Sequence, residues 1–311
     1  MPGPEHPPAT DNELHSDPVR RSSDDRGPEV GARTVHPHRA APLVRNSTLP
    51  PMSFQRLEIE IDGGVGRIWL NRPDKRNALD RVLVEELREA IAMLVGDDSV
   101  RSIVLGGRGP AFCAGADLAY LREISGYSVS DNMEDSAALA RTLQAIYEAP
   151  KPTIARVHGP AIAGGCGLAT VCDIIVAGPG ASFGYTEVRI GFIPAIVLAF
   201  LLRKVPQVQA RELVLTGRII DAKEAVARGL VTTLVDGDGD GIPALDAHIA
   251  TLTAEINRTS ASGVSLTKQM LTALDGMPLA SALDYASRMN ALTRMTPDCQ
   301  AGIARFLEKA S

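Results

Sequence analysis

Apolar and polar residues alternate strictly from Leu57 onward. The sequence reads Leu-Glu-Ile-Glu-Ile-Asp, continues through Gly63-Gly64, and then gives a second short apolar run that ends at Leu70. Alternation with a period of two places one face of a strand on a core, and a Gly-Gly pair permits a tight reversal. The pattern predicts a β-hairpin.

A helical spacing replaces this alternation after the loop Asn71–Asn77. Between Leu79 and Val95 apolar residues recur every three or four positions, with acids and arginines between them, which is typical of an amphipathic helix. Similar spacing, caps and helix formers predict helices over 134–148, 203–217, 221–225 and most of 244–311.

Short runs rich in apolar and β-branched residues predict buried strands. These runs occupy 102–105, 153–157, 174–177 and 231–235. Strands that alternate with helices indicate an α/β fold, here with a helical C-terminal region. The apolar run Phe192–Leu202 has about half the length that a bilayer span needs, and it contains Pro194, so we expect it to be a core segment.

Residues 1–52 differ in composition from the rest of the chain. They are rich in Pro, Ser, Asp and Arg and contain few aromatic or branched apolar residues. Such a segment cannot bury enough surface to offset the entropy of ordering, so we predict a disordered extension. Its acidic residues, and its lack of an apolar stretch, argue against a targeting peptide.

The composition excludes several classes of function. A net charge of -5 and an aromatic content of 4% do not suit a nucleic-acid surface. No Cys-x-x-Cys pair occurs, and only His158 and His248 lie beyond residue 38, so neither a metal site nor a disulfide framework is indicated. Cys113 and Cys166 are interpreted as packing residues, because no histidine is placed to activate them. We expect a cytoplasmic protein without a nucleic-acid or membrane partner.

Two turns of small residues follow predicted strands. Phe112–Leu118 reads Phe-Cys-Ala-Gly-Ala-Asp-Leu, and Ala163–Gly165 opens a short helix that continues to Thr170. Turns of this kind aim backbone N–H groups outward, and a helix N-terminus adds partial positive charge. One such turn is as often a packing device, but two can direct two donors at one carbonyl oxygen.

These motifs resemble those of the crotonase, or enoyl-CoA hydratase/isomerase, superfamily. The resemblance covers about residues 53–311 and rests on Asn71–Leu79, on the two turns, on Cys172-Asp173, on Phe183-Gly184-x-x-Glu187 with Ile190-Gly191-x-x-Pro194, and on Phe306–Lys309. It implies a crotonase-like spiral of repeated β-β-α units over 53–243 that holds the active site. It also implies that the helices of 244–311 assemble homotrimers, which often pair into hexamers.

The resemblance assigns catalytic roles to three residues. The backbone N–H groups of Ala114 and Gly164 would form an oxyanion hole for the thioester carbonyl of an acyl-CoA. Such donors stabilise the enolate-like state that forms when a proton is added or removed beside a thioester. Glu187 is the candidate general acid and base, and apolar neighbours between Phe183 and Phe192 are expected to raise its pKa toward neutrality.

Further positions would contact the substrate. Lys75 and Arg76 lie where the family contacts CoA phosphates, and Ala116 and Leu118 lie where it holds adenine through backbone groups. The other predicted substrate-binding residues are Asp117, Gly167, Phe183, Phe192, Pro194, Phe306 and Lys309, the last two as a pair that closes over the nucleotide, often from a neighbouring subunit. CoA belongs to the substrate, so no separate cofactor is expected.

Two departures from the family pattern bear on the reaction. Hydratases with two glutamates carry the second one at the position of Gly167, where it helps to hold and activate water, and many continue with glycines where this chain has Ala195–Val197. The segment Val188–Ala195 resembles a hydratase branch that includes bacterial methylglutaconyl-CoA hydratases. We therefore expect reversible hydration of a 2-enoyl-CoA.

Two alternatives remain at this stage. One acid is enough to move a proton between two carbons, as in Δ3-Δ2 enoyl-CoA isomerases, and the missing acid is also compatible with a non-catalytic acyl-CoA-binding protein. Tyr120, Glu123 and Glu134 are candidates for a replacement polar group, although each also fits a surface position on its helix.

Overall fold

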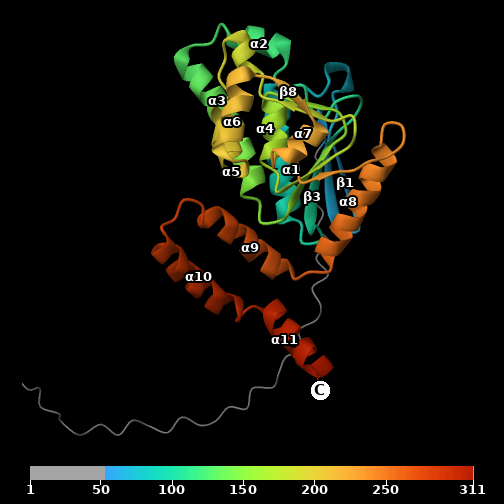
Figure 1. Ribbon diagram of the computed structural model, residues 1–311, viewed down its shortest axis with the longest axis vertical. Coiled ribbons are helices and arrows are strands. Elements are labelled where there is room, and N and C mark those ends of the chain that lie inside the picture. The colour runs from blue at the N-terminus through green and yellow to red at the C-terminus, as the bar shows by residue number, and fades with distance from the viewer. Residues whose placement is uncertain (1–52, 311) are drawn as a thin grey trace, which may run out of the picture. The chain divides into compact units, whose positions relative to one another are not determined.

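Two β-sheets organise the part of the chain that the computed structural model describes, residues 53–310 (Figure 1). The predicted disorder of residues 1–52 lies outside the described residues. The larger sheet has the strand order β1-β2-β3-β4-β6-β9, and the smaller has the order β5-β7-β8. The strands are β1 (Leu57–Asp62), β2 (Val65–Leu70), β3 (Ser102–Gly107), β4 (Thr153–Val157), β5 (Pro160–Ile162), β6 (Ile174–Ala177), β7 (Ser182–Gly184), β8 (Ile219–Asp221) and β9 (Thr233–Leu234).

The larger sheet is parallel except at its first strand. β1 pairs antiparallel with β2, with Asp62 opposite Val65, which confirms the predicted hairpin. The remaining neighbours in this sheet pair in parallel. β4 and β6 are each followed by a strand of the smaller sheet, β5 and β7, which also pair in parallel. The chain thus passes repeatedly from one sheet to the other, as a spiral of β-β-α units requires.

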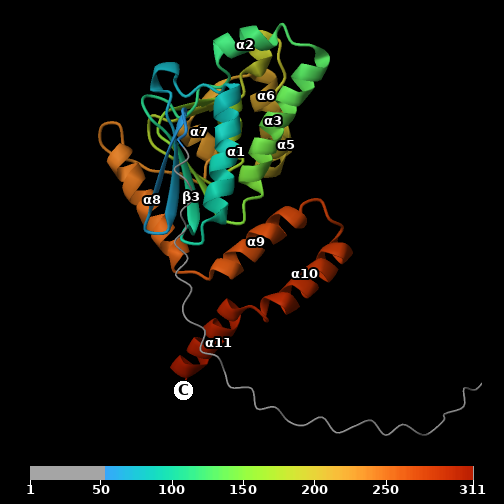
Figure 2. The same cartoon turned by 180° about the vertical axis from the view of Figure 1, so that it is seen from behind.

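Helices cover both faces of the larger sheet, and Figure 2 shows the sheet between α1 and α8. α1 contacts α3 and β1, whereas α8 contacts β3 and β6. The α-helices are α1 (Arg81–Gly96), α2 (Leu118–Ile124), α3 (Val129–Tyr147), α4 (Gly164–Thr170), α5 (Ala195–Lys204), α6 (Gln207–Thr216), α7 (Ala222–Ala227), α8 (Ile242–Asn257), α9 (Ala261–Ala273), α10 (Leu279–Thr293) and α11 (Pro297–Ala310); η1 (Pro73–Lys75) and η2 (Glu187–Ile190) are 3-10 helices.

The first helix begins two residues later than its apolar spacing predicts. The Leu79 N–H donates to Gly115 O at 2.7 Å, so Leu79 pairs with the turn after β3 instead of entering the helix. Asp80 then caps α1, because its side chain accepts a hydrogen bond from the Leu83 N–H at 2.9 Å. The buried face of α1, which includes Leu87 and Leu94, packs into the main core.

The prediction of one helix over 203–217 is wrong. α5 ends at Lys204 and α6 begins at Gln207, because Pro206 lies between them and offers no N–H for a continuous helix. The predicted core segment Phe192–Leu202 is also only partly buried. Val197 on α5 is buried, whereas Phe192, ahead of the helix, is 55% exposed.

Side-chain caps define the region after the first turn. The helix expected to carry Tyr120 and Glu123 is α2, and it begins where the Asp117 side chain accepts a hydrogen bond from the Ala119 N–H at 2.9 Å. α3 begins five residues before the predicted start at 134, because Ser128 and Asp131 form a reciprocal capping box.

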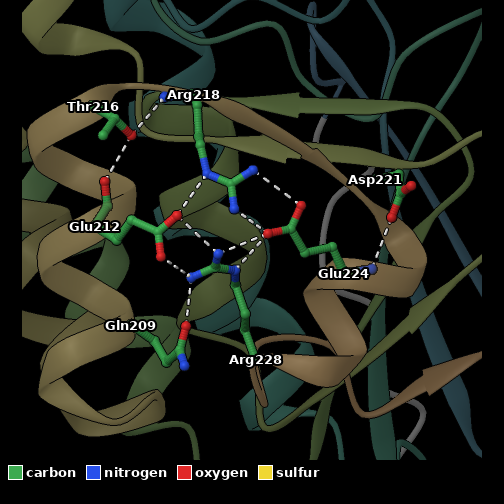
Figure 3. A network of polar contacts seen from close by, with 7 residues as sticks. All are labelled: Gln209, Glu212, Thr216, Arg218, Asp221, Glu224 and Arg228. Atoms are coloured by element: carbon green, nitrogen blue, oxygen red, sulfur yellow. Dashed lines mark hydrogen bonds and ion pairs between the residues drawn. The ribbon is translucent and has the colours of Figure 1, made fainter.

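A polar network joins α6 to the start and end of α7 (Figure 3). The Arg228 guanidinium lies 2.9 Å from Glu212 and 2.7 Å from Glu224, and Arg218 contacts the same two carboxylates. Asp221 caps α7, as predicted, by accepting from the Glu224 N–H at 2.7 Å. Four charges of alternating sign therefore fix α6, β8 and α7 to one another.

The helical content predicted after residue 243 is confirmed by α8 to α11. Lys268 of α9 is 6% exposed, and its ammonium lies 2.6 Å from Asp173 and donates to Lys151 O at 3.1 Å. α10, α11 and the turn between them expose large apolar side chains to between 51% and 74%, namely Leu279, Leu283, Leu292, Met295, Ile303 and Phe306.

Neither a membrane span nor a metal cluster is found within residues 53–310. Each helix there is too short or too polar to cross a bilayer. In the same residues, His, Cys, Asp and Glu side chains form no group of three or more that could hold a metal ion.

Candidate active site

The two turns of small residues lie against each other. The Ile162 N–H donates to Cys113 O at 2.9 Å, which joins the segment after β3 to β5. A Cβ atom on Gly165 would lie 2.2 Å from Cys113 O, and one on Gly115 would lie 3.0 Å from Ile162 O. Glycine permits both close approaches. The N-terminus of α4 is therefore held beside the turn that contains Gly115.

The N–H groups of these turns differ in their availability. The Ala114 N–H already donates to Arg76 O at 3.0 Å, whereas the Ala116 N–H has no partner in the described part of the chain. Gly164 is the first residue of α4, so its N–H is also without an intrahelical partner. The prediction that Ala114 offers a free donor is therefore wrong, and the free donor of that turn is Ala116.

Asn77 fixes the loop that occupies the Ala114 N–H. Its buried side chain accepts from the Arg72 N–H at 2.9 Å and donates to the carbonyls of Arg108 and Ala111, both at 2.8 Å. Asn77 has a positive φ of 57°, which asparagine tolerates better than most residues. The sequence reasoning missed this role, since only the fold brings the three partners together.

Asp117 takes part in an internal ion pair. Its carboxylate lies 2.7 Å from the buried Arg72 guanidinium, which also lies 3.1 Å from Asp80. Burial alone would raise the pKa of Asp117, but hydrogen bonds from Arg72 and the Ala119 N–H lower it below its usual value. The Asp117 side chain, which was predicted to bind substrate, thus anchors the turn Phe112–Leu118. Arg72 is a further residue whose role the sequence does not predict.

The backbone is strained at Ala163, directly before the Gly164 N–H. Ala163 has φ 49° and ψ -123°, a conformation that a residue with a Cβ rarely adopts. Strain of this kind costs about 1–3 kcal/mol and is common at functional sites. The Ala163 N–H donates to Gly184 O at 2.7 Å, so β7 helps to hold this conformation.

Glu187 begins η2, just after β7. Its Oε2 atom is buried and has no hydrogen-bond partner among the described residues, and burial raises the pKa of the carboxyl group as predicted. The predicted cause is only partly correct, because Val188 and Phe192 are exposed. The fully buried Cys166 and Tyr185 lie close enough to interact electrostatically with Glu187, which brings it near the first turn of α4.

The two cysteines of the turns are fully buried. Burial raises the pKa of Cys113 and of Cys166 to about 12, so both thiols stay protonated near neutral pH. This supports their interpretation as packing residues.

Gly167 faces Val197 across the contact between α4 and α5. A Cβ atom on Gly167 would lie 2.1 Å from Val197 Cγ1 and 2.9 Å from Val197 Cβ. Val197 is 3% exposed. Gly167 and the segment Ala195–Val197 are the two places where the sequence departs from the family pattern, and they are therefore in direct contact. Their separation along the chain does not reveal this contact.

The other predicted substrate-binding residues fall into three groups. Lys75, Arg76 and Leu118 are exposed at the first turn and its supporting loop, whereas Phe183 and Pro194 are buried around η2. Phe306 is exposed on α11, and Lys309 belongs to the same helix.

The three residues considered as replacements for the acid that is absent at position 167 bind other side chains. The Tyr120 hydroxyl bonds to Asp135, Glu123 accepts from the Tyr127 hydroxyl at 2.6 Å, and Glu134 pairs with Arg141 at 2.7 Å.

Comparison with known proteins adds independent evidence. Residues 60–311 match the model of the Enoyl-CoA hydratase/isomerase family. The chain is 41% identical over 247 residues to a Thermus thermophilus protein whose name assigns it provisionally to the enoyl-CoA hydratases. The aligned region covers 79% of this chain and 96% of the Thermus protein.

Solved structures agree with this family match. The enoyl-CoA hydratase of Shewanella pealeana has a TM-score of 0.78 at 31% identity and covers 82% of this chain and 94% of that one. The enoyl-CoA hydratase of Mycobacterium smegmatis has a TM-score of 0.76 at 33% identity, with 82% and 96% covered. The chain therefore belongs to the enoyl-CoA hydratase/isomerase family and has the crotonase fold.

Proposed function

We propose that this enzyme catalyses the reversible addition of water to a 2-enoyl-CoA. The observation that carries the proposal is the pair of N–H groups, of Ala116 and Gly164, that find no partner among residues 53–310 and lie on two turns in contact. The buried Oε2 atom of Glu187 belongs to a carboxyl group that interacts with Cys166 at the start of α4. Two such donors stabilise a negatively charged thioester oxygen by several kcal/mol when water is excluded.

The chemistry requires one proton transfer beside the thioester. In hydration, Glu187 takes a proton from water while the water oxygen bonds to the far carbon of the double bond and the double-bond electrons move to the thioester oxygen. The protonated Glu187 then gives that proton to the α-carbon as the thioester carbonyl forms again. Dehydration reverses these steps. Glu187 suits this transfer, because a carboxyl group with a raised pKa both holds and releases a proton near neutral pH.

The CoA moiety is proposed to bind at the loop before α1. The side chains of Lys75 and Arg76 are exposed and have no ion-pair partner in the described part of the chain, which leaves them available for phosphates. Ala116 contributes its backbone to the oxyanion hole in place of Ala114. The closing role of Phe306 and Lys309 stays part of this proposal, as do the trimer or hexamer and the cytoplasmic location.

Isomerisation of a 3-enoyl-CoA is the second candidate. It is favoured by the contact between Gly167 and Val197, which leaves Glu187 without a second carboxylate from that position. A single acid can remove a proton from one carbon and return it to another.

The deciding experiment supplies crotonyl-CoA and 3-hexenoyl-CoA separately to the purified protein in deuterated water. Loss of the conjugated thioester from crotonyl-CoA, with deuterium at the α-carbon, supports hydration. Gain of conjugation from 3-hexenoyl-CoA without added water supports isomerisation instead. No reaction with either substrate would favour an enzyme that requires a specialised acyl group, or a non-catalytic acyl-CoA-binding protein.

A Glu187→Gln variant tests the acid and base directly. We expect turnover to fall by about 10²–10⁴-fold, the usual contribution of general acid-base catalysis. Glu89→Gln is the matched control, because Glu89 is exposed on α1 and has no ion-pair partner among the residues that the structure describes. Unchanged turnover in Glu187→Gln would remove this mechanism.

A further inference from the structure

We infer that Gly167 and Val197 act as one specificity-determining pair, in which the valine side chain occupies the place of a side chain at position 167 and restricts the site to a single carboxylate. The inference rests on the proposed function and deepens it. It also makes a claim about packing that needs no substrate to test.

Position 167 is directed toward the oxyanion-hole donor. Residues three apart lie on the same face of a helix, and Gly167 is three residues after Gly164 on α4. Side chains on a helix lean toward its N-terminus, which here is the end that carries the free N–H. A carboxylate at position 167 would therefore lie over the first turn of α4, close to the reacting thioester.

Val197 fills this space and cannot easily leave it. The 2.1 Å separation between a Cβ atom at position 167 and Val197 Cγ1 is far below any real contact distance. Valine is branched at Cβ and strongly prefers one rotamer in a helix, and this side chain is packed in the main core. Any side chain at position 167 thus requires a smaller residue at 197.

Position 167 is next to Cys166, which interacts electrostatically with Glu187. The Glu187 Oε2 atom is buried without a hydrogen-bond partner in the described part of the chain, and burial favours the neutral carboxyl group. A second carboxylate nearby would repel it and share water with it, whereas the valine methyl groups do neither. The present site therefore moves protons with one acid and leaves water without a second protein base.

Four variants test the pair: Gly167→Glu, Val197→Gly, the double variant Gly167→Glu/Val197→Gly, and the double variant Gly167→Gln/Val197→Gly. We expect Gly167→Glu to melt well below the parent protein. Both double variants should melt at a higher temperature than Gly167→Glu alone, because removing the valine side chain makes room at position 167. A double variant that is no more stable than Gly167→Glu would overturn the pairing.

Hydration of crotonyl-CoA tests the effect on specificity. We expect Gly167→Glu/Val197→Gly to hydrate it about tenfold faster than the parent protein, or more, because a second acid-base group is added. The glutamine variant has the same size without the charge and should show no gain. An equal gain in both, or no gain in the stable glutamate variant, would refute the specificity role.

The proposed function and the pairing of positions 167 and 197 can fail independently. If the parent protein fails to hydrate any enoyl-CoA, or if Glu187→Gln leaves its turnover intact, the proposed function fails. The melting temperatures of the four variants still decide whether positions 167 and 197 are coupled.

Discussion

Among the described residues, no group accepts a hydrogen bond from the N–H of Ala116 or of Gly164. The Ala114 N–H is used by Arg76 O, which Asn77 holds in place. The motif places two alanines on one turn, and the sequence does not say which N–H is paired inside the protein. At the scale of single residues, the sequence therefore predicts a turn with donors but not which of its N–H groups is unpaired.

Glu187→Gln should lower activity and, at alkaline pH, increase stability. Because burial raises its pKa, the folded protein binds a proton at this carboxyl group more tightly than the unfolded chain does. Stability is therefore lost as pH rises above the ordinary value of 4.5 and through the raised pKa. We expect Glu187→Gln to raise the melting temperature at about pH 8 and to change it little at about pH 4.

Thermal melts of Glu187→Gln and Glu89→Gln across this pH range provide the measurement. The exposed Glu89 should show no comparable gain. A lower melting temperature for Glu187→Gln at alkaline pH would contradict the burial of an unpaired carboxyl group.

At the scale of elements, sequence predictions succeeded where the apolar pattern was strong. β4 and β6 have the predicted bounds because their mainly apolar and β-branched residues pack at interior positions of a sheet that is parallel there. β5 was missed because three residues give no periodicity. The helix predicted over 203–217 crosses the boundary between α5 and α6, because apolar residues at helical spacing lie close to Pro206 while the proline itself ends the helix.

The network between α6 and α7 should depend more on Arg228 than on Arg218. The Arg228 side chain is 11% exposed and that of Arg218 is 36% exposed, although both contact Glu212 and Glu224. A less exposed guanidinium is screened less by solvent, and Arg228 also donates a hydrogen bond to Gln209, which Arg218 does not contact. We expect Arg228→Ala to lower the urea midpoint more than Arg218→Ala, and the reverse order would contradict this account.

On the scale of the whole molecule, the C-terminal helices combine one buried attachment with a large exposed apolar surface. Their helical nature followed from composition and spacing, and their attachment did not. Lys268 reaches Asp173 across a long separation in the sequence, and a lysine on a helix usually indicates a solvated face. Only the fold shows that this lysine is buried.

Lys268→Met should weaken the attachment of α9. The change removes the ammonium that contacts Asp173 and Lys151 O, at a cost of about 1–3 kcal/mol. We expect a lower free energy of unfolding and faster protease cleavage after α8. Lys223→Met, an exposed site on α7, is the control and should change neither.

Exposed apolar residues on α10 and α11 predict self-assembly. Leu283 and Leu292 are each 61% exposed, and a surface of this kind usually marks an interface. Light scattering should give three or six times the mass of one chain, and Leu283→Asp/Leu292→Asp should lower it. Val129→Asp, at an exposed apolar site on α3, should leave the mass unchanged. A single-chain mass for the parent protein would refute the assembly.

The contact between Gly167 and Val197 also has a consequence for how such a site can evolve. A mutation that places glutamate at position 167 first meets the valine and is selected against, whereas loss of the valine first leaves only a cavity, which a stable protein can tolerate. The order of the two mutations is therefore constrained. A lineage that leaves the one-acid state would pass through a glycine or alanine at position 197 before it acquires a second acid.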